Sequence, residues 1–137
     1  MTLGHLAELV ARMPSWPVFL IKKDGLDMAT NEKLRPLRTS RELVEALDQS
    51  LADAREALAN TTDEHLMTSW RLLFWGKFVS EQPRRQALRF GGFNHLAHHR
   101  GQLTVYLRLN DAPAPAIYGP SEDDGSFDKA PTMESSW

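Results

Sequence analysis

The sequence has no cysteine among its 137 residues. This absence excludes disulfide bonds, cysteine nucleophiles and metal sites built on thiolates. It also favours a protein of the reducing cytoplasm, which is the location we expect. Any metal ion would have to be bound by nitrogen and oxygen atoms of the chain.

Long apolar runs and an excess of positive charge are also missing. The apolar run near the N-terminus, WPVFLI, is far shorter than the roughly 20 residues that a membrane-spanning helix needs. The formal net charge is −2 at pH 7, so no basic surface for nucleic acid is indicated. We therefore expect neither a membrane nor a nucleic acid as partner, and a small-molecule ligand instead.

What the sequence does contain is helical periodicity in three long segments. The first is interrupted by Pro14 and Pro17, and it is predicted to form one bent helix that ends near Gly25. The second covers residues 39–62 and starts with a threonine and a glutamate in capping-box register. The third covers residues 84–109 without a proline.

These patterns predict an all-α protein with a single domain over residues 1–120. Residues 69–83 mix aromatic side chains with glycine and proline, and we expect a loop or a short strand-like connection there. Residues 121–137 are polar, acidic and punctuated by proline, which is typical of a mobile tail.

Histidines are concentrated in the third helix, in the stretch FNHLAHHRGQL over residues 93–103. At 100° per residue, His95 and His99 lie 40° apart on a face that also carries leucines, and we expect this face to point inward. His98 projects to the other side. Two imidazoles at this spacing bind one divalent ion if a third ligand comes from another helix. Histidines on an apolar face are also commonly hydrogen-bonded core residues, and spacing alone leaves both interpretations open.

The histidine stretch also carries a family resemblance. The segments NHLAHHRGQLTVYLRLND and APAPAIYGPSEDD together resemble the end of the DinB-like superfamily, and MTLGHLAELVARMPSW is similar to that family's second helix. The resemblance implies an up-down-down-up four-helix bundle, to which this chain contributes three main helices because the family's first helix is absent before Met1. A missing helix leaves apolar faces exposed, so we expect a homodimer, which this family often forms.

The resemblance further implies a metal site with one histidine from the second family helix and two from the last. His95 and His99 match the pair in the last helix. His5 is our candidate for the third ligand, although many relatives carry histidine at the position of Leu9, one turn further along.

At such a site we expect zinc or nickel, since neutral imidazole binds both. We expect Arg100 and Gln102 either to support the ligating histidines or to hold the bundle together. By resemblance, the metal would activate a low-molecular-weight thiol in a transferase or isomerase. Hydrolysis is less supported, because spacing places no carboxylate as a general base. The alternative is a non-catalytic dimeric bundle whose metal site is structural, sensory or lost.

Overall fold

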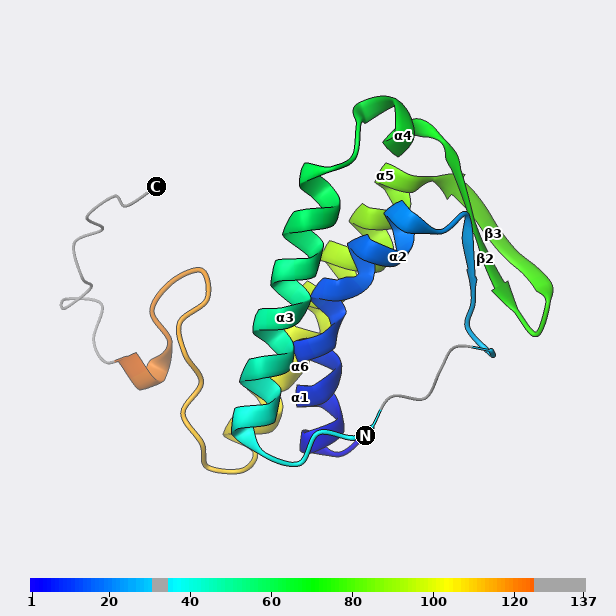
Figure 1. Ribbon diagram of the computed structural model, residues 1–137. Coiled ribbons are helices and arrows are strands. Elements are labelled where there is room, and N and C mark those ends of the chain that lie inside the picture. Colours follow the sequence, from blue (N-terminus) through cyan, green and yellow to red (C-terminus); the bar gives the residue numbers. More distant parts are fainter. Residues whose placement is uncertain (31–34, 125–137) are drawn as a thin grey trace.

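The computed structural model describes residues 1–30 and 35–124, so most of the predicted tail lies outside the described residues. Figure 1 shows three helical rods side by side, with a small sheet at one end. The first two rods run in the same direction and the third runs opposite. The first rod is α1 (Leu3–Arg12), η1 (Met13–Ser15) and α2 (Trp16–Lys22); the second is α3 (Ser40–Ala59); the third is α5 (Arg84–Ala87), η2 (Leu88–Asn94) and α6 (His95–Arg108).

The first rod bends at its prolines, as predicted. Thr2 caps α1 by accepting a hydrogen bond from the His5 amide, and the rod tightens into a 3-10 turn at Pro14 before α2 begins. The rod ends at Lys22, earlier than predicted, because Gly25 starts a strand instead of capping the helix. A Cβ atom at Gly25 would lie 2.7 Å from the Arg71 carbonyl oxygen, so only glycine fits this close strand pairing.

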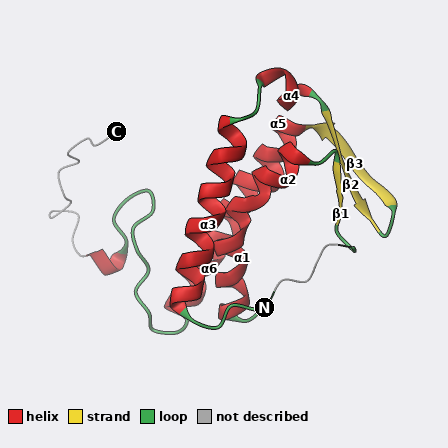
Figure 2. Ribbon diagram, viewed as in Figure 1, coloured by secondary structure: helices red, strands yellow, loops and turns green. Residues whose placement is uncertain are grey.

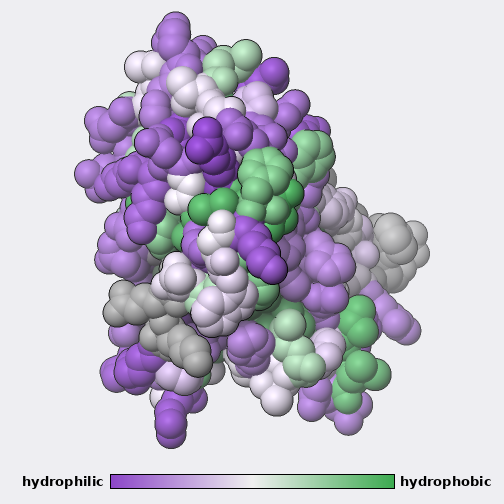
Figure 3. Space-filling model, turned by 90° about the vertical axis from the view of Figure 1, so that its right-hand side faces the viewer, coloured by the Kyte–Doolittle hydropathy of each residue, from purple (hydrophilic) through white to green (hydrophobic). Residues whose placement is uncertain are grey.

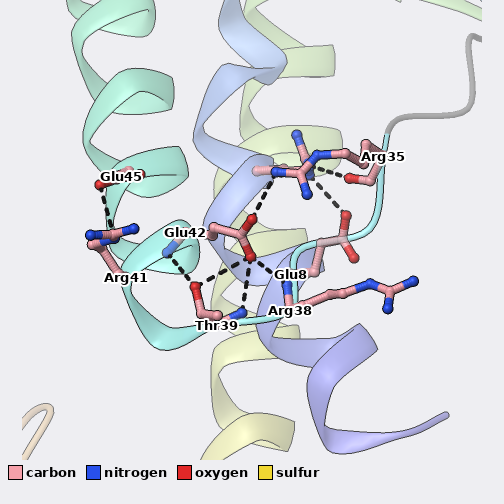
Figure 4. Close-up of polar contacts among 8 residues, drawn as sticks. Glu8, Arg35, Arg38, Thr39, Arg41, Glu42 and Glu45 are labelled. Carbon is pink, nitrogen blue, oxygen red and sulfur yellow. Dashed lines mark hydrogen bonds and ion pairs between the residues drawn. The ribbon is translucent and has the colours of Figure 1, made fainter.

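The predicted capping box at the start of α3 is confirmed. The Thr39 hydroxyl accepts a hydrogen bond from the Glu42 amide, and the Glu42 carboxylate accepts one from the Thr39 amide. The same carboxylate accepts from the Arg38 amide and from the Arg35 guanidinium, as Figure 4 shows. The Arg38 amide and then the Arg35 side chain lower the pKa of Glu42 to about 2. These contacts fix the chain as it enters α3.

The prediction of an all-α protein is wrong, because the described residues include a three-stranded sheet (Figure 2). Its strands are β1 (Gly25–Asp27), β2 (Ser69–Phe74) and β3 (Lys77–Pro83). β1 pairs parallel with β2, and β2 pairs with β3 in an antiparallel hairpin. Burial does not alternate cleanly along either hairpin strand, and the pairing slips at a bulge beside Leu72. The period-2 signal that identifies a strand is therefore weak in this sequence.

The hairpin turn consists of Trp75 and Gly76, which both have positive φ, at 52° and 68°. Two such residues form the type of turn that matches the twist of the flanking strands. The Asp27 carboxylate accepts hydrogen bonds from both turn amides, at 3.0 and 2.7 Å. Backbone hydrogen bonds, the one from Gly76 first, lower the pKa of Asp27. A tryptophan in this strained conformation is thus held by a carboxylate of the neighbouring strand.

The main core lies where α2, the sheet and the start of the third rod meet. Its buried members are Leu20, Leu26, Trp70, Ala87 and Leu88. Arg84 is also buried there, with 2% of its surface exposed.

The Arg84 side chain joins several segments at this core. It donates to the carbonyl oxygens of Leu20 and Lys23 and to the Thr68 hydroxyl, and it pairs with Asp24. The guanidinium therefore donates hydrogen bonds, from the interior of the protein, to carbonyl oxygens at the end of α2 that have no partner within the helix.

Beyond this core the hairpin exposes large apolar side chains. Viewed from the hairpin side, hydrophobic residues reach the surface among hydrophilic ones (Figure 3). The exposed ones on the hairpin are Phe74, Trp75, Phe78 and Val79. Over residues 1–30 and 35–124, no helix combines the length and the apolar character needed to cross a membrane.

Candidate metal centre

The histidine pair lies at the start of α6, directly after a π-helical segment. The third rod is one continuous helical run, as predicted, but η2 has π geometry over its seven residues. Such segments interrupt the normal angular spacing of a helix and are frequent at functional sites. The expectation that the histidine face points inward is wrong. None of the 14 residues of α6 is buried, and His95 is exposed while His99 is half-buried.

The two imidazoles of the pair face each other. The Nε2 atoms of His95 and His99 are 2.8 Å apart, and their ring centroids are 4.5 Å apart. His98 is exposed and meets only the edge of the His99 ring, with centroids 5.1 Å apart. The structure therefore brings together the i, i+4 pair that the sequence singles out.

The hydrogen bonds of the two Nδ1 atoms determine whether each Nε2 atom carries a proton or a free lone pair. Nδ1 of His99 lies 2.8 Å from Oε1 of Gln102, and because this oxygen only accepts, Nδ1 must carry the proton. His95 forms a hydrogen bond with the backbone of Gly91 that raises its pKa, so its ring is the donor there. Since Nε2 of His95 faces His99, Nδ1 is the nitrogen that remains for this bond. In their neutral forms, both rings then direct an Nε2 lone pair at the other.

Two lone pairs at 2.8 Å repel unless a cation lies between them. The pKa of His95 is lowered, first by desolvation of the ring and then by the charges of His99 and His98. A divalent metal ion is one such cation. Two nitrogens bound at about 2.0–2.1 Å are separated by about 2.9 Å on an octahedral ion and by about 3.3 Å on a tetrahedral one, so the observed 2.8 Å needs little or modest ring rotation to bind either. The residues present thus fit two ligands of one metal ion.

His5 does not join the pair. Within the described part of the chain, no three histidine or acidic residues come close enough to hold one metal ion. The antiparallel arrangement of α1 and α6 explains this, because a Cβ atom at Gly91 would lie 3.9 Å from the Trp16 ring, which puts these two positions beside each other. At equal rise per residue, this places Leu9 opposite residues 98–99 and His5 opposite Gln102. His5 is therefore about one helical turn too far along the axis.

Arg100 and Gln102 have different partners. Gln102 contacts His99 directly and sets its tautomer. Arg100 instead donates from Nη2 to the Tyr118 hydroxyl at 2.8 Å, and its guanidinium lies 5.2 Å from the centre of the Tyr118 ring. It ties the segment after α6 back onto the helix.

Two contacts at this site are not predicted by the sequence pattern. The Gly91 backbone contact to His95 follows from an i, i−4 spacing that a π-helical segment alters. Tyr118 is part of the proline-rich segment after α6, and its position depends on how that segment folds back. Neither contact can be derived from residue types alone.

Comparison with known proteins gives two matches. The model of the DinB family matches residues 19–133, which include the histidine pair but not His5. An uncharacterised protein of Bacillus subtilis (strain 168), YrdA, is 32% identical over 79 residues. This match covers 56% of the chain and 47% of YrdA, so the chain spans about half the length of this relative.

Proposed function

The chain belongs to the DinB family, and we propose that it binds one divalent metal ion through His95 and His99. The observation that carries the proposal is the pair of Nε2 atoms facing each other at 2.8 Å, with both Nδ1 atoms occupied by other hydrogen bonds. A metal ion removes the repulsion between the two lone pairs.

We propose zinc or nickel as the bound ion. Neutral imidazole is a good ligand for both, and the chain has no cysteine that would favour a softer metal. Gln102 holds the His99 ring with its Nε2 lone pair toward the site, and Gly91 does the same for His95. Both supports are short-range contacts on the same rod, so the pair is arranged before any metal arrives.

The further proposal is a transferase or isomerase that activates a low-molecular-weight thiol. A bound divalent ion would supply Lewis acidity that lowers the pKa of a thiol or water at an open position. Two features support this role: the protein offers only two ligands within the described residues, and His95 is open to solvent. No acidic side chain of the described residues joins the pair, which leaves hydrolysis without an evident general base.

The direct test is metal content and metal-dependent stability of the protein purified without a histidine tag. Elemental mass spectrometry should find about one ion per chain after loading with zinc and dialysis. At a free zinc concentration of about 100 times Kd, the free energy of unfolding should rise by about 2.7 kcal/mol. Both effects should be absent in His95→Ala and in His99→Ala.

His98→Ala is the matched control, because it removes a neighbouring imidazole that meets the edge of the His99 ring but takes no part in the contact between the two Nε2 atoms. It should bind zinc as the wild type does. Binding that survives in His95→Ala and His99→Ala, or that is lost equally in His98→Ala, would exclude the pair as the site. His5→Ala tests whether His5 is a third ligand. Unchanged zinc affinity means that it is not, whereas a loss of affinity of tenfold or more means that α1 shifts to bring His5 to the metal.

The alternative is a non-catalytic bundle with a structural or sensory metal, and the exposure of His95 does not favour it. The two roles differ in what a thiol does. In the enzyme, a thiol added to the zinc-loaded protein ionises at lower pH, which its ultraviolet thiolate absorbance reports, and it reacts faster with an electrophile. With a structural or sensory metal, zinc raises stability but leaves the thiol unchanged.

A further inference from the structure

An apolar groove lies between α3 and the third rod. Both of these pack against the first rod, which forms the floor of the groove. The groove is lined by Leu51, Ala54 and Leu58 of α3, by Phe93 and Leu96 of the third rod, and by Met13 of the first rod. Its volume is about 170 Å³. Because an apolar cavity of about 150 Å³ binds benzene, this groove has room for a ring or chain of about six carbons.

Gly92, in the π-helical segment, borders this space. Gly92 is buried, yet a Cβ atom added to it would meet no atom of another element within 4 Å. Gly101, on the same rod, has equally open space beside it, but Gly101 is exposed, so that space is solvent. The open space beside Gly92 is therefore part of the groove, which the packing of the three rods leaves unfilled.

One positive charge stands beside this apolar space. Arg55 of α3 is the only charged residue among the described residues that line the groove. It is exposed, and it forms no ion pair within the described part of the chain. The helix positions three and four residues before and after it hold only leucine and alanine, so no acid lies one turn away on α3. A guanidinium in this position is free to bind the carboxylate of a ligand.

We propose that the groove binds a small apolar carboxylate, such as an aromatic acid. The hydrocarbon part lies in the groove beside Gly92 and Leu96, where its burial removes apolar surface from water. The carboxylate accepts hydrogen bonds from the Arg55 guanidinium at the edge of the groove. An apolar lining with a few polar groups that orient the ligand is typical of small-molecule sites. The inference does not depend on the metal site, because neither His95 nor His99 is among the described residues that line the groove.

The first experiment titrates benzoate and benzamide into the protein at pH 7 and follows the backbone amide signals by nuclear magnetic resonance. The two ligands have nearly the same size and shape, but only benzoate carries a charge. Benzoate should bind with a Kd on the order of 1 mM and should shift the amide signals of Gly92 and Leu96. Benzamide should bind about fivefold more weakly, which is the effect of one exposed ion pair.

Arg55→Gln tests the origin of this preference. The variant should bind both ligands equally, with about the affinity that the wild type has for benzamide. Arg41→Gln is the matched control, because Arg41 is also an exposed arginine of α3 but does not line the groove. It should keep the wild-type preference for benzoate. A preference that persists in Arg55→Gln would show that Arg55 does not bind the carboxylate, and the proposal would fail.

Substitution of Gly92 tests the place of the hydrocarbon part. Gly92→Val fills the open space and should weaken the binding of both ligands by about tenfold or more. Gly101→Val is the matched control, because it makes the same exchange on the same rod where the added groups face water. Gly92→Ala covers the case in which valine disturbs the rod. It adds one carbon where no other element lies within 4 Å, and it should weaken binding by about fourfold with unchanged circular dichroism.

Three results overturn the proposal. The first is a wild type whose amide signals do not shift with either ligand well above the expected Kd, which would mean that another protein element closes the groove. The second is a set of shifts that lies outside the groove. The third is equal binding by Gly92→Val and Gly101→Val, since the ligand would then not occupy the space beside Gly92.

Discussion

The two ends of the helical bundle are held together by different kinds of contact. At the end that carries the sheet, apolar side chains such as Leu20 and Trp70 are almost fully buried around the buried guanidinium of Arg84. At the end where α3 begins, the contacts are polar and largely open to water, with Glu42 binding Arg35 and the Thr39 amide. Water screens the second kind and not the first. Single side chains should therefore decide stability at the sheet end, and pH should matter more at the other.

The largest effect should come from Arg84→Met. Methionine fills much of the same volume but leaves the carbonyl oxygens of Leu20 and Lys23 without their buried donor. Because an unsatisfied buried carbonyl is costly, the free energy of unfolding should fall by about 3 kcal/mol in urea denaturation. Arg85→Met is the control, since Arg85 is exposed and its loss should change stability little. Equal effects of the two substitutions would show that burial of Arg84 does not stabilise this end.

The next effect is a gain in stability at the hairpin turn of the same end. Trp75→Gly relieves the positive φ of a residue with a side chain, so the free energy of unfolding should rise by about 1 kcal/mol. Trp75→Ala is the matched control, because it removes the same exposed ring and keeps the strained conformation. If both variants change stability equally, the side chain and not the backbone determines the effect.

The sequence predicts the parts of this fold that depend on local rules. The capping box at Thr39, the bend at Pro14 and the unbroken third rod all follow from contacts within a few residues. The sheet does not, because β1 pairs with β2 across more than forty residues, and the hairpin lacks a clear alternation of burial. Its strongest local signal is Gly76, and the Trp75 that precedes it is an unusual residue for such a turn.

The same difference between local and long-range contacts applies to the histidine site. His95 and His99 are four residues apart on one helix, so local geometry is enough to bring their rings together. The position of His5 depends on how far α1 slides along α6, which side-chain packing between two rods decides. The inward orientation of the pair also depends on long-range packing, since no residue on any face of α6 is buried.

The smallest effect belongs to the end where α3 begins, and it appears only in acid. The folded carboxyl of Glu42 has a pKa of about 2 against an ordinary value of 4.5. Between these pH values the unfolded chain binds a proton that the folded chain does not, so a falling pH favours unfolding. The stabilisation by Glu42 should therefore be complete above pH 4.5 and should be lost as the pH falls toward 2.

Thermal melts of the wild type and of Glu42→Gln between pH 6 and pH 2 measure this dependence. The variant should be less stable near pH 6, and the difference should shrink as the pH falls, because glutamine has no charge to lose. Glu45→Gln is the control, since Glu45 only approaches the exposed Arg41 at 3.7 Å and has no part in the capping box. A difference that stays constant down to pH 2 would mean that the charge of Glu42 does not hold this end, and that the contrast between the two ends lies in packing alone.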